Sequence, residues 1–344
     1  MPQIDIKNLS LAELKEFLVK YNQPAFHAQQ IFIWIYQKSV YDFNKMTDLS
    51  ADLRVFLNKY FFINSIVLFK KQESQDGTKK LLFKLNDGNF IESVIIPASG
   101  RNTGCISSQV GCKFLCKFCA SGALGFKRNL SAGEIIEEIL FLRDHCPDKK
   151  LTHLVFMGTG EPFDNYDSVL KAIRIINSKE SLNIGARRIT ISTSGVIPGI
   201  EKLIKERIQV ELSVSLHAAF DQLRSEIMPV NKAYPLKYLI DACKKYILET
   251  NRQVTFEYIL IDGINSDLKN ARELGKLISG MNCKVNLIPV NPIKELSINP
   301  PASKNIAQFK EHLIKSGINV TLRAERGQDI NAACGQLRLK YEKK

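Results

Sequence analysis

The sequence predicts an α/β protein in which a parallel sheet follows a small helical region and a set of β-hairpins. Three observations lead to this fold class. Apolar, β-branched segments alternate with amphipathic segments from about residue 98 onward. Two Asp-Gly pairs separate strand-like runs just before that point, and a helix-capping pattern stands near the N-terminus.

The first 62 residues are predicted to form a helical accessory domain. Ser10 and Glu13 make a capping box that opens an apolar-periodic stretch. A second such stretch covers residues 25–38, and Ser50 is a candidate cap for a third helix. Several lysines lie among the aromatic residues of this domain, including Lys7, Lys15, Lys20 and Lys38. They make the domain a candidate RNA-binding surface, and the alternative is an ordinary solvated surface.

Residues 63–97 are predicted to form a β-rich connector. The runs IVLFKKQES, TKKLLFKL and FIESVIIP have strand composition. Asp76-Gly77 lies between the first two runs and Asp87-Gly88 between the last two, and both pairs are strong hairpin signals. Within the third run, strand alternation alone leaves Glu92 free to face solvent.

Residues 98–325 are predicted to form the core, and residues 326–344 a C-terminal segment. After a short strand near Cys105, the strand candidates are LTHLVFMG, RRITISTS, QVELSVSL, QVTFEYILI and CKVNLIPV. Helices lie between them, one opened by a capping box at Ser131 and Glu134. About six βα units give a parallel sheet that can curve into a barrel, with ligands at the carboxyl ends of its strands.

Charge and hydropathy bound the partners. The chain carries 48 Lys and Arg against 35 Asp and Glu, a net charge of +13. Such an excess favours polyanions, although it also serves solubility. We find no apolar stretch of roughly 20 residues and no signal-peptide pattern, so we expect a cytoplasmic protein with no membrane partner.

Three cysteines form the most informative motif. Cys112, Cys116 and Cys119 have the spacing C-x3-C-x2-C in a loop after the first core strand. Three thiolates can hold three irons of a [4Fe–4S] cluster and leave the fourth iron open to a ligand. A structural zinc site normally takes four protein ligands, so the spacing favours iron–sulfur, with Cys105 remaining as a candidate fourth ligand.

This motif resembles that of the radical-SAM superfamily, which implies a partial (β/α)6 barrel. In that superfamily the open iron binds S-adenosylmethionine (SAM), whose reductive cleavage yields a 5′-deoxyadenosyl radical. The run Gly158-Thr-Gly160-Glu161-Pro162 ends the second core strand and looks like the glycine-rich SAM motif. Small residues admit a ligand, and Glu161 can accept hydrogen bonds from the SAM ammonium group.

Further segments resemble the adenine-methylating branch, over about residues 76–337. They are CISSQVGCKFLCKFCASG, RRITISTSG, LSVSLHA, NLIPVNP and RGQDINAACGQL. The resemblance is closest to bacterial dual-specificity enzymes that methylate C2 of an adenine in 23S ribosomal RNA and in some transfer RNAs. It implies SAM contacts, besides Gly160 and Glu161, from Ser192, Ser215, Leu216, His217 and Asn291. Without the resemblance, turn residues and a core histidine would explain these positions as well.

The resemblance also implies a two-cysteine mechanism that uses two SAM per turnover. Cys334 takes a methyl group from one SAM, and the radical from the second activates it for addition to the base. Glu92 then removes the ring proton. Cys105 releases the product by forming a transient disulfide with Cys334. The usual electron donor of the family is a flavodoxin system.

Three alternatives remain at this point. A related enzyme methylates C8 of the same adenine and confers antibiotic resistance; residues 76–80 and the segment CKVNLIPVNP with Asn291 favour C2. A non-catalytic iron–sulfur or zinc protein that binds RNA would leave Cys105 and Cys334 without roles. A radical-SAM enzyme acting on a small molecule would leave the net charge of +13 unexplained. If the chain binds RNA, Lys127 and Arg128 are candidate phosphate contacts.

Overall fold

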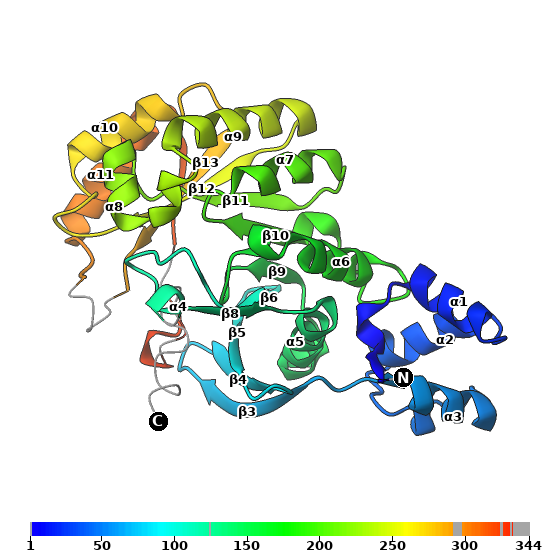
Figure 1. The fold of residues 1–344 in the computed structure, drawn as a ribbon. Coiled ribbons are helices and arrows are strands. Elements are labelled where there is room, and N and C mark those ends of the chain that lie inside the picture. The colour runs from blue at the N-terminus through cyan, green and yellow to red at the C-terminus, as the bar shows by residue number, and fades with distance from the viewer. Residues whose placement is uncertain (1, 124, 292–297, 324–325, 331, 333–344) are drawn as a thin grey trace.

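The structure is a computed structural model that describes residues 2–123, 125–291, 298–323, 326–330 and 332. The N-terminal lobe lies to one side of the main sheet (Figure 1). Its elements are β1 (Ile4–Asp5), α1 (Leu11–Lys20), α2 (His27–Phe32), a π-helical turn (Ile33–Gln37), α3 (Ala51–Tyr60) and β2 (Phe61–Phe62). The Ser10–Glu13 capping box is present, and Ser50 caps α3 by accepting a hydrogen bond from the Leu53 amide. The predicted helices of this region are therefore confirmed.

A ten-stranded sheet runs through the rest of the chain, in the order β14-β13-β12-β11-β10-β9-β6-β5-β4-β3. Its strands are β3 (Ile66–Glu73), β4 (Lys79–Leu85), β5 (Phe90–Ala98), β6 (Arg101–Cys105), β9 (His153–Phe156), β10 (Ile189–Thr193), β11 (Glu211–Ser215), β12 (Val254–Leu260), β13 (Cys283–Pro289) and β14 (Asn319–Leu322). Strands β3 to β6 pair antiparallel, whereas β6 and β9 to β14 are mutually parallel.

The predicted parallel strands and both hairpins are present, with two additions. The three hairpin strands do not form a separate unit, because β5 pairs with β6 and so extends the barrel sheet. The short strand β14 adds a seventh parallel strand at the edge that the sequence pattern did not indicate. Its four residues are mostly exposed, so it lacks the apolar signature of the buried strands.

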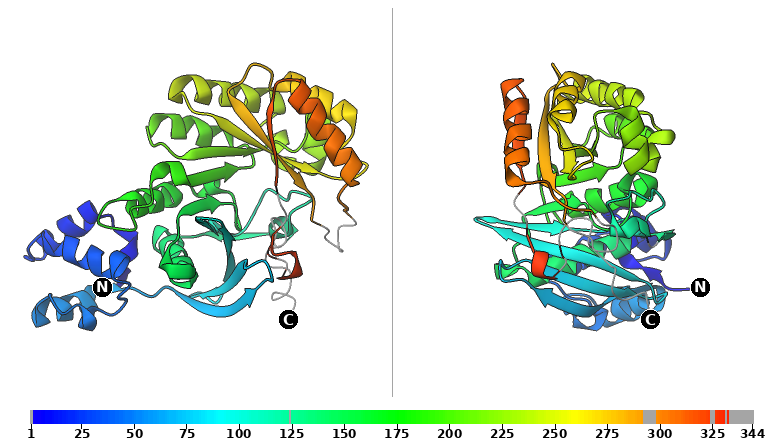
Figure 2. Two further views of the ribbon diagram at one scale, coloured as in Figure 1. Left: turned by 180° about the vertical axis from the view of Figure 1, so that it is seen from behind. Right: turned by 90° about the vertical axis from the view of Figure 1, so that its left-hand side faces the viewer.

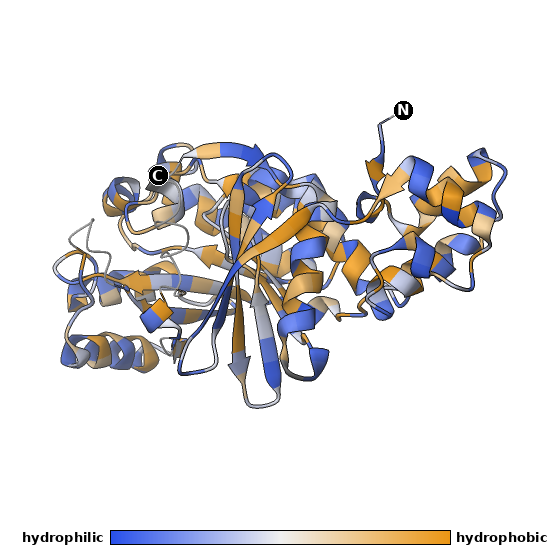
Figure 3. Cartoon of the chain, turned by 90° about the horizontal axis from the view of Figure 1, so that it is seen from below, coloured by the Kyte–Doolittle hydropathy of each residue, from blue (hydrophilic) through white to orange (hydrophobic). Residues whose placement is uncertain are grey.

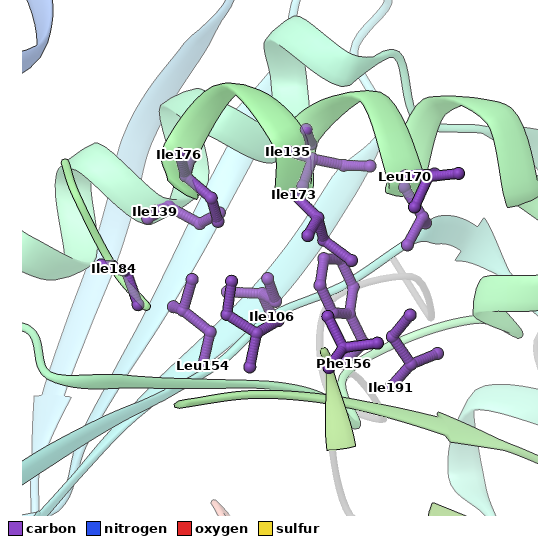
Figure 4. Close-up of a cluster of buried hydrophobic side chains, with 14 of the residues drawn as sticks. Ile106, Ile135, Ile139, Leu154, Phe156, Leu170, Ile173, Ile176, Ile184 and Ile191 are labelled. Atoms are coloured by element: carbon purple, nitrogen blue, oxygen red, sulfur yellow. The ribbon is translucent and has the colours of Figure 1, made fainter. Parts of the chain in front are cut away.

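Helices cover one face of the parallel strands. They are α5 (Ala132–His145), α6 (Tyr166–Asn177), α7 (Ile197–Lys205), α9 (Leu236–Thr250), α10 (Leu268–Leu277) and α11 (Ser303–Lys315). Helix α8 (Asp221–Ile227) lies instead against the loop that contains Phe114 and Phe118. Figure 4 shows isoleucines of α5 and α6 directed at Leu154 and Phe156 of β9. The capping box at Ser131 and Glu134 is present at the start of α5.

The two faces of each parallel strand differ in hydropathy. In Figure 3, hydrophilic and hydrophobic residues both occur along the strands. In β12, Val254, Phe256 and Tyr258 are fully buried against the helices. Thr255 and Glu257 alternate with them and line a cavity inside the curved sheet. We refer to the helix-covered side of β6 and β9–β14 as the packing face and to the cavity-lining side as the lumen face. Ligand chemistry is therefore confined to the lumen face and the strand ends.

Candidate active site

The three motif cysteines lie in a loop between two short paired strands, β7 (Gln109–Gly111) and β8 (Phe126–Asn129), that also contains helix α4 (Ala120–Ala123). The loop is held by hydrogen bonds from the Cys119 amide to the Cys116 carbonyl (3.1 Å) and from the Lys117 amide to the Ile227 carbonyl at the end of α8 (3.0 Å). Cys112, Cys116 and Cys119 are half-buried and line one cavity of about 150 Å³. The fold therefore directs all three thiols into a shared space.

This arrangement fits an iron–sulfur cube. No three His, Cys, Asp or Glu side chains among the described residues converge closely enough to hold a single metal ion. A cube is held differently, since each thiolate ligates its own iron and the thiols surround a volume. Burial raises the pKa of Cys112 to about 12 and that of Cys116 well above its usual range. Bound iron supplies the positive charge that such buried thiolates require.

The glycine-rich loop after β9 closes the opposite side of the cavity. Gly160 has φ +108°, and a Cβ there would lie 2.6 Å from the Cβ of Gln109. A Cβ on Gly158 would lie 2.6 Å from the backbone of Ile106. Close packing against the chain after β6 therefore demands both glycines, whether or not a ligand is bound.

Glu161 links the ends of two strands. Its Oε2 accepts hydrogen bonds from the amide (2.6 Å) and the hydroxyl (2.7 Å) of Ser194, and its Oε1 accepts one from the Phe163 amide (3.0 Å). Burial raises its pKa. The carboxyl group thus fixes the loop after β9 to the loop after β10, and its contact with a SAM ammonium group remains a prediction.

Most of the predicted SAM contacts line this same small cavity: Gly160, Glu161, Ser192, Ser215, His217 and Asn291. Leu216 is the exception, because its side chain is fully buried in the main core. The structure therefore gathers residues from four strand ends around one space, as expected for a ligand site at the carboxyl edge of a parallel sheet.

His217 is held as a neutral imidazole. Its backbone has φ +59°, its Nδ1 accepts a hydrogen bond from the Ile259 amide (3.0 Å), and its ring lies edge-on to Phe118. Burial lowers its pKa to about 3, with Arg224 contributing. Because Nδ1 is an acceptor, the ring proton belongs on Nε2, which makes the imidazole a hydrogen-bond donor at the cavity.

Arg224 of α8 is a site residue that the sequence did not reveal. Its side chain is fully buried. The guanidinium donates to the carbonyls of Ser194 (2.7 Å), Ser215 (3.0 Å) and Leu216 (3.0 Å). Its charge also lowers the pKa of Cys116 against the effect of burial. A lone arginine on a short amphipathic helix looks like a surface residue in sequence, so no local signal identified it.

Cys105 lies at the end of β6, and the structure brings the C-terminal segment to it. Its side chain packs with Val94, Val155, Ile330 and Ala332. The predicted methyl carrier, Cys334, lies outside the described residues, two positions beyond Ala332. Residues more than two hundred positions apart in the sequence thus share one buried cluster, which joins Cys105 to the C-terminal segment.

The hairpin turn before β4 anchors this segment, and the 3-10 turn Gln328–Ile330 lies beside it in Figure 2. The Gly327 amide donates to Asp76 Oδ2 (3.0 Å), and the Ser74 hydroxyl donates to Asp329 Oδ1 (2.5 Å). Although burial opposes ionisation, hydrogen bonds from Thr78 and Gly327 lower the pKa of Asp76 to about 2. The Asp76-Gly77 pair therefore does more than turn the chain: it holds the segment that leads to Cys334.

Glu92 of β5 is buried rather than solvent-facing, which rules out the interpretation that its strand alternation left open. Its Oε1 lies 3.6 Å from the Lys80 ammonium, and its backbone carbonyl accepts a hydrogen bond from the Ser107 hydroxyl (2.9 Å). Strand β5 is covered on both sides, which the sequence could not indicate because the covering residues come from other segments. Glu92 lines neither the small cavity nor the larger one described next.

A second cavity of about 780 Å³ fills the lumen of the barrel. It meets the small cavity at five shared residues, Met157, Glu257, Ile288, Asn291 and Arg323. The two cavities therefore adjoin, the small one at the cysteine loop and the larger one in the barrel.

Two of the candidate RNA contacts make ion pairs within the chain, and one of the two is buried. Lys7 is fully buried and pairs with Asp5 (2.7 Å) and Glu137 (3.2 Å), so its assignment to an RNA-binding surface was wrong. Arg128 pairs with Asp87 and makes two 2.8 Å hydrogen bonds to Glu134. Lys15 and Lys20 are exposed on α1. The aromatic rings of α1 and α3 pack mainly on one another.

Comparison with known proteins shows the family of the chain. Residues 4–63 match the model of the ribosomal RNA large subunit methyltransferase N-terminal domain, and residues 106–274 match that of the radical SAM superfamily. The chain is 48% identical over 345 aligned positions to the probable dual-specificity RNA methyltransferase RlmN of Staphylococcus aureus strain JH9, covering 99% of this chain and 95% of the relative. The protein of the same name from strain Newman gives the same values.

The chain belongs to the RlmN family. Members of this family are radical-SAM RNA methyltransferases, which use a [4Fe–4S] cluster and SAM. The crystal structure of a radical SAM methyltransferase from Sphaerobacter thermophilus is 43% identical in sequence, with a TM-score of 0.94 over 97% of this chain and 99% of that one. The predicted fold class is thereby confirmed. None of the described helices is long and apolar enough to cross a membrane.

Proposed function

We propose that this chain methylates C2 of a specific adenine in 23S ribosomal RNA and also methylates adenine in transfer RNA. One observation carries the proposal: the cysteine loop and the glycine-rich loop line the small cavity, and Val155 and Ala332 of the Cys105 cluster line the larger cavity that adjoins it. The printed name of the relatives, a dual-specificity RNA methyltransferase, supports two RNA substrates. We infer that it acts in the cytoplasm and receives electrons from a flavodoxin system.

Cys112, Cys116 and Cys119 would hold the cluster, while the small cavity would hold SAM through the residues that line it. Bound there, these cofactors supply the methyl group and the radical that activates it. The neutral His217 and the strand-end serines are polar groups suited to orient a SAM molecule. Phe118 and Met228 add apolar walls that exclude water from the reacting atoms.

The chain's own chemistry falls to Cys334, Cys105 and Glu92. In the proposal, the Cys334 sulfur carries the methyl carbon to the base and remains bonded to it as a thioether. Glu92, whose Oε1 lies 3.6 Å from the Lys80 ammonium, takes the ring proton, and the unpaired electron left on the adduct would pass to the bound cluster. The Cys105 thiolate then attacks the Cys334 sulfur, the carbon–sulfur bond breaks with its electron pair leaving toward the base, and a proton taken up by that carbon completes the methyl group. Ile330 and Ala332 support this step, because their packing brings the C-terminal segment to Cys105.

The test is nucleoside mass spectrometry on unmodified 23S RNA and transfer RNA after anaerobic incubation with reconstituted enzyme, SAM and a reductant. We expect 2-methyladenosine from both RNAs. 8-Methyladenosine would replace C2 by C8, and a protein with verified cluster that cleaves SAM but leaves both RNAs unmethylated would contradict the proposal.

Cysteine variants test the mechanism. Cys334→Ala is expected to retain the cluster and form no methylated adenine, whereas Cys105→Ala is expected to accumulate a covalent protein–RNA adduct visible on a denaturing gel. Cys146→Ala is the matched control, since Cys146 is a buried thiol at the end of α5, away from the cavities. Normal turnover by either of the first two variants would overturn the two-cysteine mechanism.

A further inference from the structure

The amino-terminal end of the barrel carries a ring of cations that the proposed chemistry does not use. Arg101 begins β6, Arg187 and Arg188 directly precede β10, and Lys284 is the second residue of β13. Parallel strands begin at the same edge of their sheet, so these residues lie together, and all four line the 780 Å³ cavity. We name Arg101, Arg187, Arg188 and Lys284 the basic rim. It lies at the end of the barrel opposite the cysteine loop.

The neighbouring His153 is affected by two of these charges. His153 begins β9 and lines the same cavity. Its pKa is lowered first by burial and then by the charges of Arg101 and Arg188. Two guanidinium groups thus act on one imidazole, in line with the gathering of positive charge at this end of the lumen.

The rim charges are poorly compensated within the chain. The carboxylates that line the cavity are Glu211 and Glu257. Glu211 already pairs with Arg252, and Glu257, which accepts a 2.7 Å hydrogen bond from Asn286, interacts with a rim residue through the charge of Lys284. Among the described residues, neither Arg188 nor Lys284 has a carboxylate within ion-pair distance. Four cations facing two carboxylates in a large open cavity leave an excess of positive charge that suits an anionic ligand.

The distance between the rim and the small cavity also suits a bound nucleotide. Strand β10 leads from Arg188 at the rim to Ser192 at the small cavity. Four strand residues span roughly 13 Å. A nucleotide whose base extends through the lumen toward the small cavity would therefore leave its backbone near the rim. The opposite end of the barrel is covered by the cysteine loop and α8, which are hydrogen-bonded to each other.

We propose that the basic rim binds the backbone phosphates of RNA nucleotides that flank the target adenine, so that the base enters the lumen from the amino-terminal end of the barrel. This inference rests on the proposed function for the identity of the RNA. It places the RNA-binding surface on the barrel itself rather than on the exposed lysines of the N-terminal lobe. Phosphate contacts of this kind position the strand without selecting its sequence.

The experiment measures binding of a fluorescently labelled, unmodified RNA stem-loop to the reconstituted holoenzyme by anisotropy over a range of salt concentrations. Removing one contact to a single-stranded phosphate lowers the slope of log K against log salt by about 0.7. We expect that reduction, with weaker binding, for Arg188→Ala and for Lys284→Ala. The cluster spectrum and the affinity for SAM should stay at wild-type values, which separates a lost RNA contact from misfolding.

Matched controls remove the same charge elsewhere. Lys244→Ala and Lys245→Ala alter exposed residues of α9 on the outside of the barrel and should leave the slope unchanged. Lys15→Ala and Lys20→Ala test the N-terminal lobe directly. Wild-type affinity and slope in both rim variants would overturn the rim, and a slope lost only in the Lys15 and Lys20 variants would move the RNA-binding surface to the lobe.

An NMR titration of His153 gives a second readout that needs no variant of the rim. A phosphate between Arg101 and Arg188 offsets their charge, so the pKa of His153 should rise when RNA binds. An unchanged His153 pKa in saturated complex would contradict the proposal. Failure of the wild-type enzyme to bind RNA at all would overturn the proposed function together with the rim, whereas binding with unaffected rim variants would overturn the rim alone.

Discussion

The packing face and the lumen face of the parallel sheet belong to the same strands yet differ in residue type and in what they contact. Along β10, Ile189 and Ile191 are buried against helices, while Thr190 and Ser192 border the cavities. Along β13, Val285 and Leu287 pack outward, while Asn286 and Ile288 face inward. One residue of register separates a side chain that stabilises the fold from one that can touch a ligand.

This difference shows how the barrel can host a reaction without losing its core. The apolar area needed for stability is buried on the packing face, where close packing leaves little tolerance for change. The lumen face carries serines, threonines and charged groups around a space of about 780 Å³, so it contributes less to stability and more to chemistry. Substitutions on the two faces should therefore separate stability from function.

The largest expected loss of stability comes from Ile191→Ala on the packing face. Ile191 is 1% exposed and packs in the cluster of Figure 4. Truncating a buried isoleucine removes about 2–5 kcal/mol from the free energy of unfolding. Urea unfolding followed by circular dichroism measures this loss. A change below about 1 kcal/mol would mean that the packing face is less tightly packed than its burial indicates.

Glu138 is an exception on the packing face, and it predicts a pH effect. Its carboxyl on α5 is fully buried, accepts hydrogen bonds from the Ser93 hydroxyl and the Ser107 amide, and has its pKa raised to about 8 by burial. The folded protein holds this proton more tightly than the unfolded chain does. Stability should therefore fall as pH rises, by roughly 1.4 kcal/mol per unit between about pH 5 and 8.

Glu138→Gln should remove that dependence, because an amide oxygen can accept both hydrogen bonds and does not ionise. Thermal unfolding of both proteins between pH 5 and 8 is the measurement, with the variant expected to gain most at the upper end. Parallel pH profiles for the two proteins would show that Glu138 is ionised in the folded state.

At the cavity end of the sheet, Gly160→Ala is expected to cost about 1–3 kcal/mol, because a side chain at φ +108° is strained and the new Cβ meets Gln109. SAM binding, measured by calorimetry, should weaken as the loop shifts. Gly185→Ala is the matched control, since it precedes β10 with nothing within 4 Å of its added Cβ. Equal behaviour of the two variants would contradict a strained, closely packed loop.

The smallest effect is expected from Thr190→Ala on the lumen face, next to Ile191. The Thr190 side chain is half-buried and makes no hydrogen bond to the described residues. The free energy of unfolding should change by no more than about 0.5 kcal/mol in the same urea experiment. A loss comparable to that of Ile191→Ala would remove the distinction between the two faces.

The sequence alone predicted the parts of the molecule that depend on local patterns. Apolar runs between amphipathic stretches indicated the parallel strands, and the capping boxes at Ser10 and Ser131 marked two helix starts. The C-x3-C-x2-C spacing and the glycine-rich run identified the loops that the structure places around one cavity. These features can be predicted from the sequence because each depends on residues within a few positions of one another.

Only the tertiary structure decided which distant residues meet. It buried Lys7 beside Glu137, enclosed Glu92 next to Lys80, and placed Arg224 beneath the loops after β10 and β11. It joined the Asp76 turn to the C-terminal segment and brought Ala332 to Cys105. Strand periodicity fixes that neighbouring side chains face opposite ways, but the burial and charge around a face depend on elements far away in the chain. For that reason the chemistry of the motifs was set by sequence, while the shape and charge of the space they share were set by the fold.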